Sequence, residues 1–310
     1  MTAAAPTPEE LRVHFESKGF VPPAATLTTL HLAEALGKPV LIEGPPGVGK
    51  TETARLWADF HGAPLIRLQC YEGLDEARAL YEWSYGKQML YAQLLREKTA
   101  ELLGGARGLK DAMAALRGET DAFFSEEFLL PRPILRAITS ERPAVLLIDE
   151  IDRSDEEFEA FLLEVLAESQ VTIPEVGTIR ARHAPRVALT SNDTRELSDA
   201  LRRRCLYLYL DYPSFEDEVR IVERRVPGVG PELRDRLVRF VHALRRADLK
   251  RPPGTAEVID WAAALAALGA ETLSDGVLAE SLGALLKRRE DLEQALKKGV
   301  TPHFRRGNEE

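Results

Sequence analysis

The sequence lacks most of the features that mark secreted, membrane-spanning or cysteine-coordinated metal proteins. It has only two cysteines, Cys70 and Cys205, which lie far apart in no metal-binding spacing and read as small core residues. No run of 18 apolar residues occurs, so we expect no membrane span. The first ten residues lack the basic segment and apolar core of a secretory signal. We therefore expect a cytoplasmic protein.

Positive charge is also in deficit. The chain carries 41 Lys and Arg residues against 50 Asp and Glu residues, which gives a formal net charge of -9. A surface of this sign disfavours non-specific binding to nucleic acid as the main activity. The composition, 45% hydrophobic and 29% charged, is that of a soluble globular protein. The length of 310 residues allows one large domain and one small domain.

A glycine-rich loop stands between a predicted strand and a predicted helix. Residues 44–51 read GPPGVGKT, which matches the phosphate-loop pattern G-x-x-x-x-G-K-[ST]. Residues 39–43, PVLIE, predict a short buried strand, and residues 52–59 predict a helix. In that context the glycines let the backbone turn tightly and direct N–H groups at phosphate oxygens, while the helix N-terminus favours an anion. A plain Gly/Pro loop at a strand end is the alternative.

This motif predicts a site for a nucleoside triphosphate with Mg²⁺. The Lys50 ammonium would reach the β- and γ-phosphates, and the Thr51 hydroxyl would be a Mg²⁺ ligand. The predicted nucleotide-binding residues of the segment are Gly44, Pro45, Pro46, Gly47, Val48, Gly49, Lys50, Thr51 and Glu52.

Two acidic residues follow a second apolar run. Residues 144–148 read AVLLI, which is typical of a central parallel strand covered on both faces, and Asp149 and Glu150 come directly after it. Ligands of open α/β sheets bind at the carboxyl ends of the strands. We therefore predict that Asp149 holds the Mg²⁺ shell and that Glu150 orients the attacking water. A solvated Asp-Glu turn is the alternative.

A third short apolar run, 186–190, also ends in polar residues. Asn192 follows it and is one of only two asparagines in the chain, the other being Asn308. Its amide could touch the γ-phosphate or the lytic water. The alternative is an Asn-Asp turn, which side-chain hydrogen bonding favours.

Three adjacent arginines precede the predicted strand 206–210. Arg202, Arg203 and Arg204 would be costly to bury unpaired, so we expect them either in solvent or against anions. An arginine that reaches the nucleotide of a neighbouring subunit would stabilise charge in the transition state. Of the three, Arg204 is the preferred candidate.

The segments GPPGVGKT, VLLIDEID, TSN and LSDALRRRC, in this order and spacing, resemble the Walker A, Walker B, sensor 1 and arginine-finger segments of an AAA+ ATPase. Three further segments resemble the CoxD-like branch of its MoxR group: LIRLQCYEGLDEARALYEW, LLEVLAESQVTIPEVGTIRA and RPPGTAEVIDWAAAL. The resemblance covers roughly residues 20–270. It implies an α/β P-loop core, with a five-stranded parallel sheet between helices, followed by a small all-α lid. It also implies ATP with Mg²⁺, a homo-oligomeric ring (usually a hexamer), remodelling or maturation of a client protein, and a partner with a von Willebrand factor A domain.

The resemblance assigns the Walker A, Walker B and sensor 1 roles to Lys50, Thr51, Asp149, Glu150 and Asn192. Arg204 aligns with the finger arginine, but Arg203 stands where the family has an acidic residue, so the choice between these two stays open. Gln69 occupies the place of a polar residue that restrains the Walker B glutamate. Arg251 lies near the usual position of the sensor 2 arginine, at a different offset.

The pattern along the chain predicts an N-terminal extension (1–20), an α/β core (21–211), a helical lid (212–300) and a disordered tail (301–310). The core contains an aromatic-bearing insertion at about 72–128, which could grip a substrate chain or pack on the body. It also contains a β-hairpin at about 170–181, in which Gly177 can take φ > 0. The hairpin could touch a partner or be structural.

The lid is expected to hold three or four amphipathic helices. Residues 231–244 place one apolar face on a helix, formed by Leu233, Leu237, Phe240, Val241 and Leu244. Most of the arginines at 234, 236, 239, 245 and 246 lie off that face. Because acidic residues are interleaved with them, we interpret this side as solvated rather than DNA-binding.

A ring-forming ATPase that remodels proteins is the leading hypothesis. A nucleic-acid-associated AAA+ motor is the first alternative, although the sequence contains no separate DNA-binding module such as a zinc finger. The second is a monomeric P-loop switch or kinase, for which the N-K-x-D guanine signature is missing and the arginine cluster has no evident purpose.

Overall fold

The computed structural model describes residues 5–91, 93, 126–174 and 176–297. Two compact units make up the chain. The first comprises Met1–Phe60, Thr190–Thr194 and Leu206–Glu310, and the second comprises His61–Leu189 and Arg195–Cys205. The predicted disordered tail, 301–310, and most of the predicted insertion lie outside the described residues.

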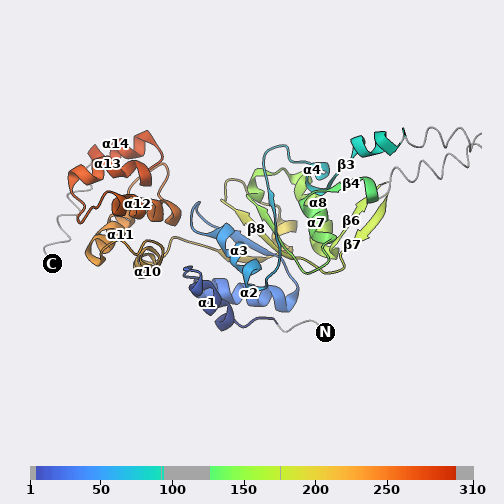
Figure 1. Cartoon of the computed structure of the whole chain (residues 1–310), viewed down its shortest axis with the longest axis horizontal. Coiled ribbons are helices and arrows are strands. Elements are labelled where there is room, and N and C mark those ends of the chain that lie inside the picture. The colour runs from blue at the N-terminus through green and yellow to red at the C-terminus, as the bar shows by residue number, and fades with distance from the viewer. Residues whose placement is uncertain (1–4, 92, 94–125, 175, 298–310) are drawn as a thin grey trace, which may run out of the picture. The chain divides into compact units, whose positions relative to one another are not determined.

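A five-stranded parallel sheet carries the predicted motifs (Figure 1). Its strand order is β2-β5-β8-β1-β9. The strands are β1 (Val40–Glu43), β2 (Leu65–Gln69), β5 (Val145–Asp149), β8 (Arg186–Ser191) and β9 (Leu206–Tyr209). Every residue of β1 and β5 is buried, as expected for strands covered on both faces. The predicted fold class, an α/β core with this sheet and a C-terminal helical region, is confirmed.

The N-terminal segment packs two helices, α1 (Pro8–Ser17) and α2 (Ala24–Leu36), beside α3 (Lys50–Phe60). A capping box starts α1: the Glu10 N–H donates to the Thr7 hydroxyl, and the Glu10 carboxylate accepts from the Thr7 N–H. Leu11 and Phe15 on α1 are fully buried. The predicted extension therefore contributes apolar side chains to the core of its unit.

The second unit carries two small antiparallel sheets. The predicted hairpin is confirmed: β6 (Gln170–Ile173) pairs with β7 (Gly177–Arg180), and Gly177 has φ +98°. The other sheet pairs β3 (Tyr81–Trp83) with β4 (Leu129–Pro131). The remaining elements of this unit are α4 (Glu76–Leu80), η1 (Glu126–Phe128), α7 (Pro133–Ile138), η2 (Ile151–Arg153), α8 (Glu156–Glu168) and α9 (Asp199–Arg204).

The aromatic residues of the predicted insertion that the structure describes divide between packed and exposed. Tyr81 and Trp83 pack edge to face on β3, with ring centroids 5.7 Å apart. Tyr91 packs in the same way against Phe128, at 5.2 Å. The Tyr85 residue is 70% exposed. Tyr91 is also 40% exposed, so these residues do not decide between packing on the body and gripping a substrate chain, and both alternatives stay predictions.

Five helices follow β9 in the described residues, where the sequence pattern predicted three or four. They are α10 (Phe215–Arg225), α11 (Pro231–Arg246), α12 (Thr255–Ala267), α13 (Asp275–Leu285) and α14 (Arg289–Lys297), drawn in brown to red in Figure 1. The last two are separated only by residues 286–288, a break that the periodicity did not reveal. No helix of the described chain is both long and apolar enough to cross a membrane.

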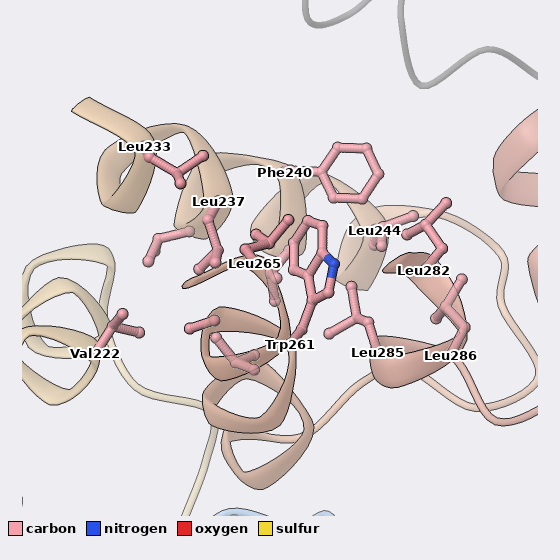
Figure 2. Close-up of a cluster of buried hydrophobic side chains, with 14 of the residues drawn as sticks. Val222, Leu233, Leu237, Phe240, Leu244, Trp261, Leu265, Leu282, Leu285 and Leu286 are labelled. Atoms are coloured by element: carbon pink, nitrogen blue, oxygen red, sulfur yellow. The ribbon is translucent and has the colours of Figure 1, made fainter. Parts of the chain in front are cut away.

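These helices have their own hydrophobic core, centred on Trp261 (Figure 2). The Trp261 ring lies 5.4 Å from that of Phe240, and its indole N–H donates to the Ser281 hydroxyl at 2.9 Å. The apolar face predicted for 231–244 is confirmed, because all five of its residues are buried: Leu233, Leu237, Phe240, Val241 and Leu244.

Candidate nucleotide site

The phosphate loop joins β1 to α3 and has the backbone geometry that its glycines permit. Gly44 has φ +150° and Gly47 has φ +78°, a region that residues with a Cβ rarely adopt. A Cβ on Gly44 would lie 1.9 Å from the Leu210 carbonyl oxygen. The Leu210 N–H in turn donates to the Glu43 carbonyl at 2.8 Å. The start of the loop is therefore shaped by a close backbone approach that only glycine allows.

Lys50 and Asn192 meet at this loop although they are 142 residues apart in the chain. The Lys50 residue is 7% exposed, and its ammonium donates to the carbonyl oxygens of Gly44 at 2.6 Å and Pro45 at 2.8 Å. It also donates to Asn192 Oδ1 at 2.8 Å. A buried ammonium in a curved backbone cradle, with a polar amide beside it, suits a triphosphate. These residues therefore fit the nucleotide that the motif predicts.

A turn follows β8 at the position of Asn192. Asp193 has φ +58°, and its N–H donates to the Ser191 hydroxyl at 3.0 Å. The bond that bends the chain here is thus made by the Ser191 hydroxyl and not by the Asn192 side chain. The Asn192 amide nevertheless accepts from Lys50, so the turn presents this side chain to the phosphate loop.

In the second unit, a polar network holds the two acids that follow the apolar run of β5. The Asp149 residue is 3% exposed, and Arg67 Nη2 lies 2.5 Å from its Oδ2. Gln69 Nε2 donates to Glu150 Oε2 at 2.9 Å, which matches the restraining position that the resemblance gave to Gln69. Arg153 Nε lies 3.0 Å from the same Glu150 oxygen. Hydrogen bonds therefore fix the Glu150 carboxylate from two sides.

Backbone geometry adds to this restraint, because Glu150 has φ +57° in the left-handed region, where a non-glycine residue is strained. Sequence reasoning found Gln69 but missed Arg67 and Arg153. A signal for Arg67 existed in the strand Leu65–Gln69, because residues 67 and 69 alternate to the same face of β2. The sequence alone could not connect Arg67 with Asp149, because the pairing of Gln69 with Asp149 across the sheet is known only from the structure.

Cys70, next to this network, is a core residue as predicted. Burial raises the pKa of its thiol to about 12, and the nearby charges of Asp149, Asp152 and Glu150 add to the rise. Cys205, which was also predicted to be a core residue, is only partly buried.

The arginine cluster occupies the end of α9. Arg203 and Arg204 are exposed. Arg204 Nη1 donates a long hydrogen bond, 3.4 Å, to the Ala200 carbonyl oxygen of its own helix. Of the two environments expected for the cluster, these two side chains have the solvated one. A buried acid, Glu159, positions the start of this segment by accepting from the Ser198 N–H at 2.8 Å and pairing with Arg195. The choice between Arg203 and Arg204 as finger stays a prediction.

The N-terminus of α12 lies against the phosphate loop. Ala256 N–H donates to the Gly47 carbonyl at 3.1 Å. Arg251, the expected sensor 2 substitute, is half exposed, and its Nη2 lies 3.7 Å from Glu257 Oε1. This arrangement leaves the sensor 2 role of Arg251 a prediction.

Comparison with known proteins places these motifs in a family. Residues 39–205, more than half of the chain, match the family described as AAA domain (dynein-related subfamily). The chain belongs to this family. It is therefore an AAA+ ATPase, an ATP hydrolase with a P-loop, and proteins of this class bind nucleotide, generally with Mg²⁺. No curated protein matches the sequence.

Solved structures of low similarity include the Thermotoga maritima RuvB Holliday junction branch migration motor. It is 16% identical, with 90% of this chain and 74% of that chain covered and a TM-score of 0.47. A mutant of Thermotoga maritima RuvB is also 16% identical, with 90% of this chain and 76% of that chain covered and a TM-score of 0.49. Similarity at this level bears on neither substrate nor partner.

Proposed function

We propose that this AAA+ ATPase forms a homo-oligomeric ring, a hexamer, that couples ATP hydrolysis to remodelling or maturation of a client protein or metalloenzyme in the cytoplasm. The observation that most directly supports nucleotide-driven action is the convergence of Lys50 and Asn192 on the phosphate loop. The proposals of a client protein and of a partner with a von Willebrand factor A domain are supported by the three segments that resemble the CoxD-like branch of the MoxR group. Residues 21–211 would form the core and 212–300 the lid.

In this proposal each site residue has one task. The Lys50 ammonium exchanges its loop carbonyls for the β- and γ-phosphate oxygens, and Asn192 contacts the γ-phosphate or the attacking water. Thr51 and Asp149 would hold Mg²⁺, which when bound neutralises charge on the phosphate oxygens. Glu150 orients and polarises the attacking water, while Gln69 and Arg153 hold its carboxylate in place.

A finger from the neighbouring subunit would complete the site. The exposed end of α9 presents Arg203 and Arg204, and we propose Arg204 as the residue that reaches the next subunit's nucleotide. Fingers of this kind typically contribute on the order of 10³-fold or more to the rate. Arg204→Ala should therefore lower kcat by about that factor while ATP binding is retained, as measured by steady-state hydrolysis and nucleotide titration.

Mixing two inactive variants tests the shared site. Arg204→Ala subunits keep the Lys50–Glu150 half, and Glu150→Gln subunits keep the finger, so their mixed rings should regain part of the ATPase activity. As the control, Glu150→Gln mixed with Lys50→Ala should regain none, because both lesions lie in the same half. Failure of the first mixture to recover activity would contradict the shared site. Stimulation of hydrolysis by DNA, in place of a protein partner, would favour the nucleic-acid-associated alternative.

A further inference from the structure

Residues 252–256, the end of the connection from α11 and the first two residues of α12, contact the phosphate loop. A Cβ on Gly254 would lie 2.5 Å from the Pro46 carbonyl oxygen and 2.9 Å from the Gly47 Cα, so any side chain there would force the two segments apart. Two residues on, the Ala256 N–H donates to the Gly47 carbonyl at 3.1 Å. Since the first N–H groups of a helix have no partner within it, this bond also caps α12.

An arginine of α11 holds this segment in place. The Arg245 side chain is 7% exposed, and its Nε donates to the Pro253 carbonyl at 2.9 Å. Its two Nη atoms donate to the two carboxylate oxygens of Glu218 on α10, at 2.7 and 2.8 Å. The guanidinium also lies over the Tyr212 ring, 4.3 Å from its centroid. The Nε and both Nη atoms of the guanidinium therefore donate hydrogen bonds, which fixes its position and orientation.

The two residues just before this segment provide a second anchor. The backbone N–H groups of Lys250 and Arg251 donate to the Asp291 carboxylate at 2.9 and 3.2 Å, and Asp291 is 2% exposed. Pro252 and Pro253 then restrict the backbone as far as Gly254. Because the backbone from Pro253 to Gly254 is restricted in this way, a displacement of Pro253 would also move Gly254 relative to the phosphate loop.

The ion pair between Arg245 and Glu218 is buried. Glu218 is fully buried, and a buried ion pair often stabilises a fold no more than apolar residues of similar volume. What this pair supplies is geometry, because it ties α10, α11 and the Pro253 carbonyl to a single point.

We propose that Arg245, oriented by Glu218, is a positioning residue for the phosphate loop. By holding Pro253 it sets Gly254 and the Ala256 N–H against Pro46 and Gly47, and so keeps the loop in the shape that receives the triphosphate. The inference rests on the proposed nucleotide role of the loop. Arg245 touches no substrate; it acts through Pro253.

Arg245→Lys tests the geometry while it keeps the charge, because an ammonium cannot reproduce the fork that joins Glu218 and Pro253. The matched control is Arg246→Lys, the exposed next residue of the same helix. We expect Arg245→Lys to raise KM for ATP and to lower kcat/KM by up to about 100-fold, the loss that a misplacement of about 1 Å can cause. A lowered melting temperature with wild-type KM and kcat would show a purely structural role and overturn the inference.

Gly254→Ala tests the contact without touching the arginine. The added methyl group collides with Pro46, so KM should rise as in Arg245→Lys while the helical core around Trp261 keeps its stability. Gly283→Ala is the control, because a Cβ at this exposed helical position meets nothing within 4 Å. Wild-type nucleotide affinity in Gly254→Ala would overturn the inference even if Arg245→Lys failed to fold.

Lys50→Ala separates the two proposals. Loss of ADP binding in Lys50→Ala, together with unchanged binding in Arg245→Lys and Gly254→Ala, would leave the proposed function standing and remove only the positioning role. Normal ADP binding in Lys50→Ala would instead remove the nucleotide role of the loop itself.

Discussion

At the scale of single residues, Asn192 has the most informative contact. Its amide oxygen accepts from the Lys50 ammonium at 2.8 Å, so the pair is neutral on the asparagine side. A carboxylate at this position would form an ion pair with Lys50 and would compete with a phosphate for the same ammonium.

Asn192→Asp should therefore bind ATP at least about tenfold more weakly than wild type, since a charge-assisted hydrogen bond worth roughly 1.5–3 kcal/mol has to be given up. Asn192→Ala, which removes the amide without adding charge, should weaken binding less. Isothermal titration of ATP against both variants measures the difference. Equal affinities for the two would show that residue 192 does not face the phosphates.

The residues found from sequence were those that a local motif defines. Lys50 and Thr51 stand in a fixed pattern, and Asp149 and Glu150 follow an apolar run, so position alone identified them. Arg67, Arg153 and Arg245 have no such pattern. Their partners depend on strand register or on helix packing, and neither can be read from one sequence.

At the scale of elements, the helices after β9 behave as a module with an acid-sensitive centre. Burial of Glu218 raises the pKa of its carboxyl, but hydrogen bonds from His242 and Arg245 outweigh burial and leave the pKa below its usual value. A lowered pKa in the folded state contributes stability above the unfolded value of about 4.3, and that contribution is lost as the pH falls through the folded pKa.

Glu218→Gln should consequently destabilise the helices by about 3–5 kcal/mol at pH 7, because it breaks a buried pair and leaves Arg245 unmatched. The difference from wild type should shrink as the pH falls below the unfolded value of about 4.3 and through the lower pKa of the folded carboxyl, because the wild-type side chain then loses its charge. Urea unfolding of both proteins at pH 7, 5 and 3.5, followed by tryptophan fluorescence, measures this. A difference that stays constant with pH would show that the Glu218 charge is not what stabilises the helices.

Periodicity predicted these elements in part. The apolar face of α11 was correct, because a stripe of leucines repeats at helical spacing. The expectation that its arginines lie mostly in solvent was wrong for two of them: the side chains of Arg234 and Arg245 are 9% and 7% exposed and pair with Glu223 and Glu218. A helical wheel shows which side a residue faces, but not that another helix covers that side.

At the scale of the whole molecule, the alternation of strands and helices was sufficient to predict the α/β class and the helical C-terminal part. The strand order, β2-β5-β8-β1-β9, did not follow from composition or spacing, because it depends on pairing between distant segments. The separation of α13 from α14 was likewise not predictable from the sequence, since a short break between two helices leaves the periodicity almost unchanged.

Assembly is the property that belongs to this scale. Glu150→Gln should bind ATP without hydrolysing it and hold the protein in its ring, because the phosphate contacts through Lys50 remain while the water-orienting carboxylate is lost. Light scattering with and without ATP should show a stable hexamer for Glu150→Gln. Lys50→Ala should show no ATP-dependent change in mass. A monomeric mass for ATP-loaded Glu150→Gln would contradict the ring.

The close approach of Gly44 and Leu210 has a practical consequence for truncated versions of the protein. A fragment cut to the family-matched span, 39–205, would lose β9 and with it one of the two neighbours of β1. The Glu43 carbonyl would lose the N–H of Leu210 as its donor, and the strand that leads into GPPGVGKT would become an unprotected sheet edge, a common starting point for aggregation. Expression trials of the isolated nucleotide module should therefore extend at least through Leu210.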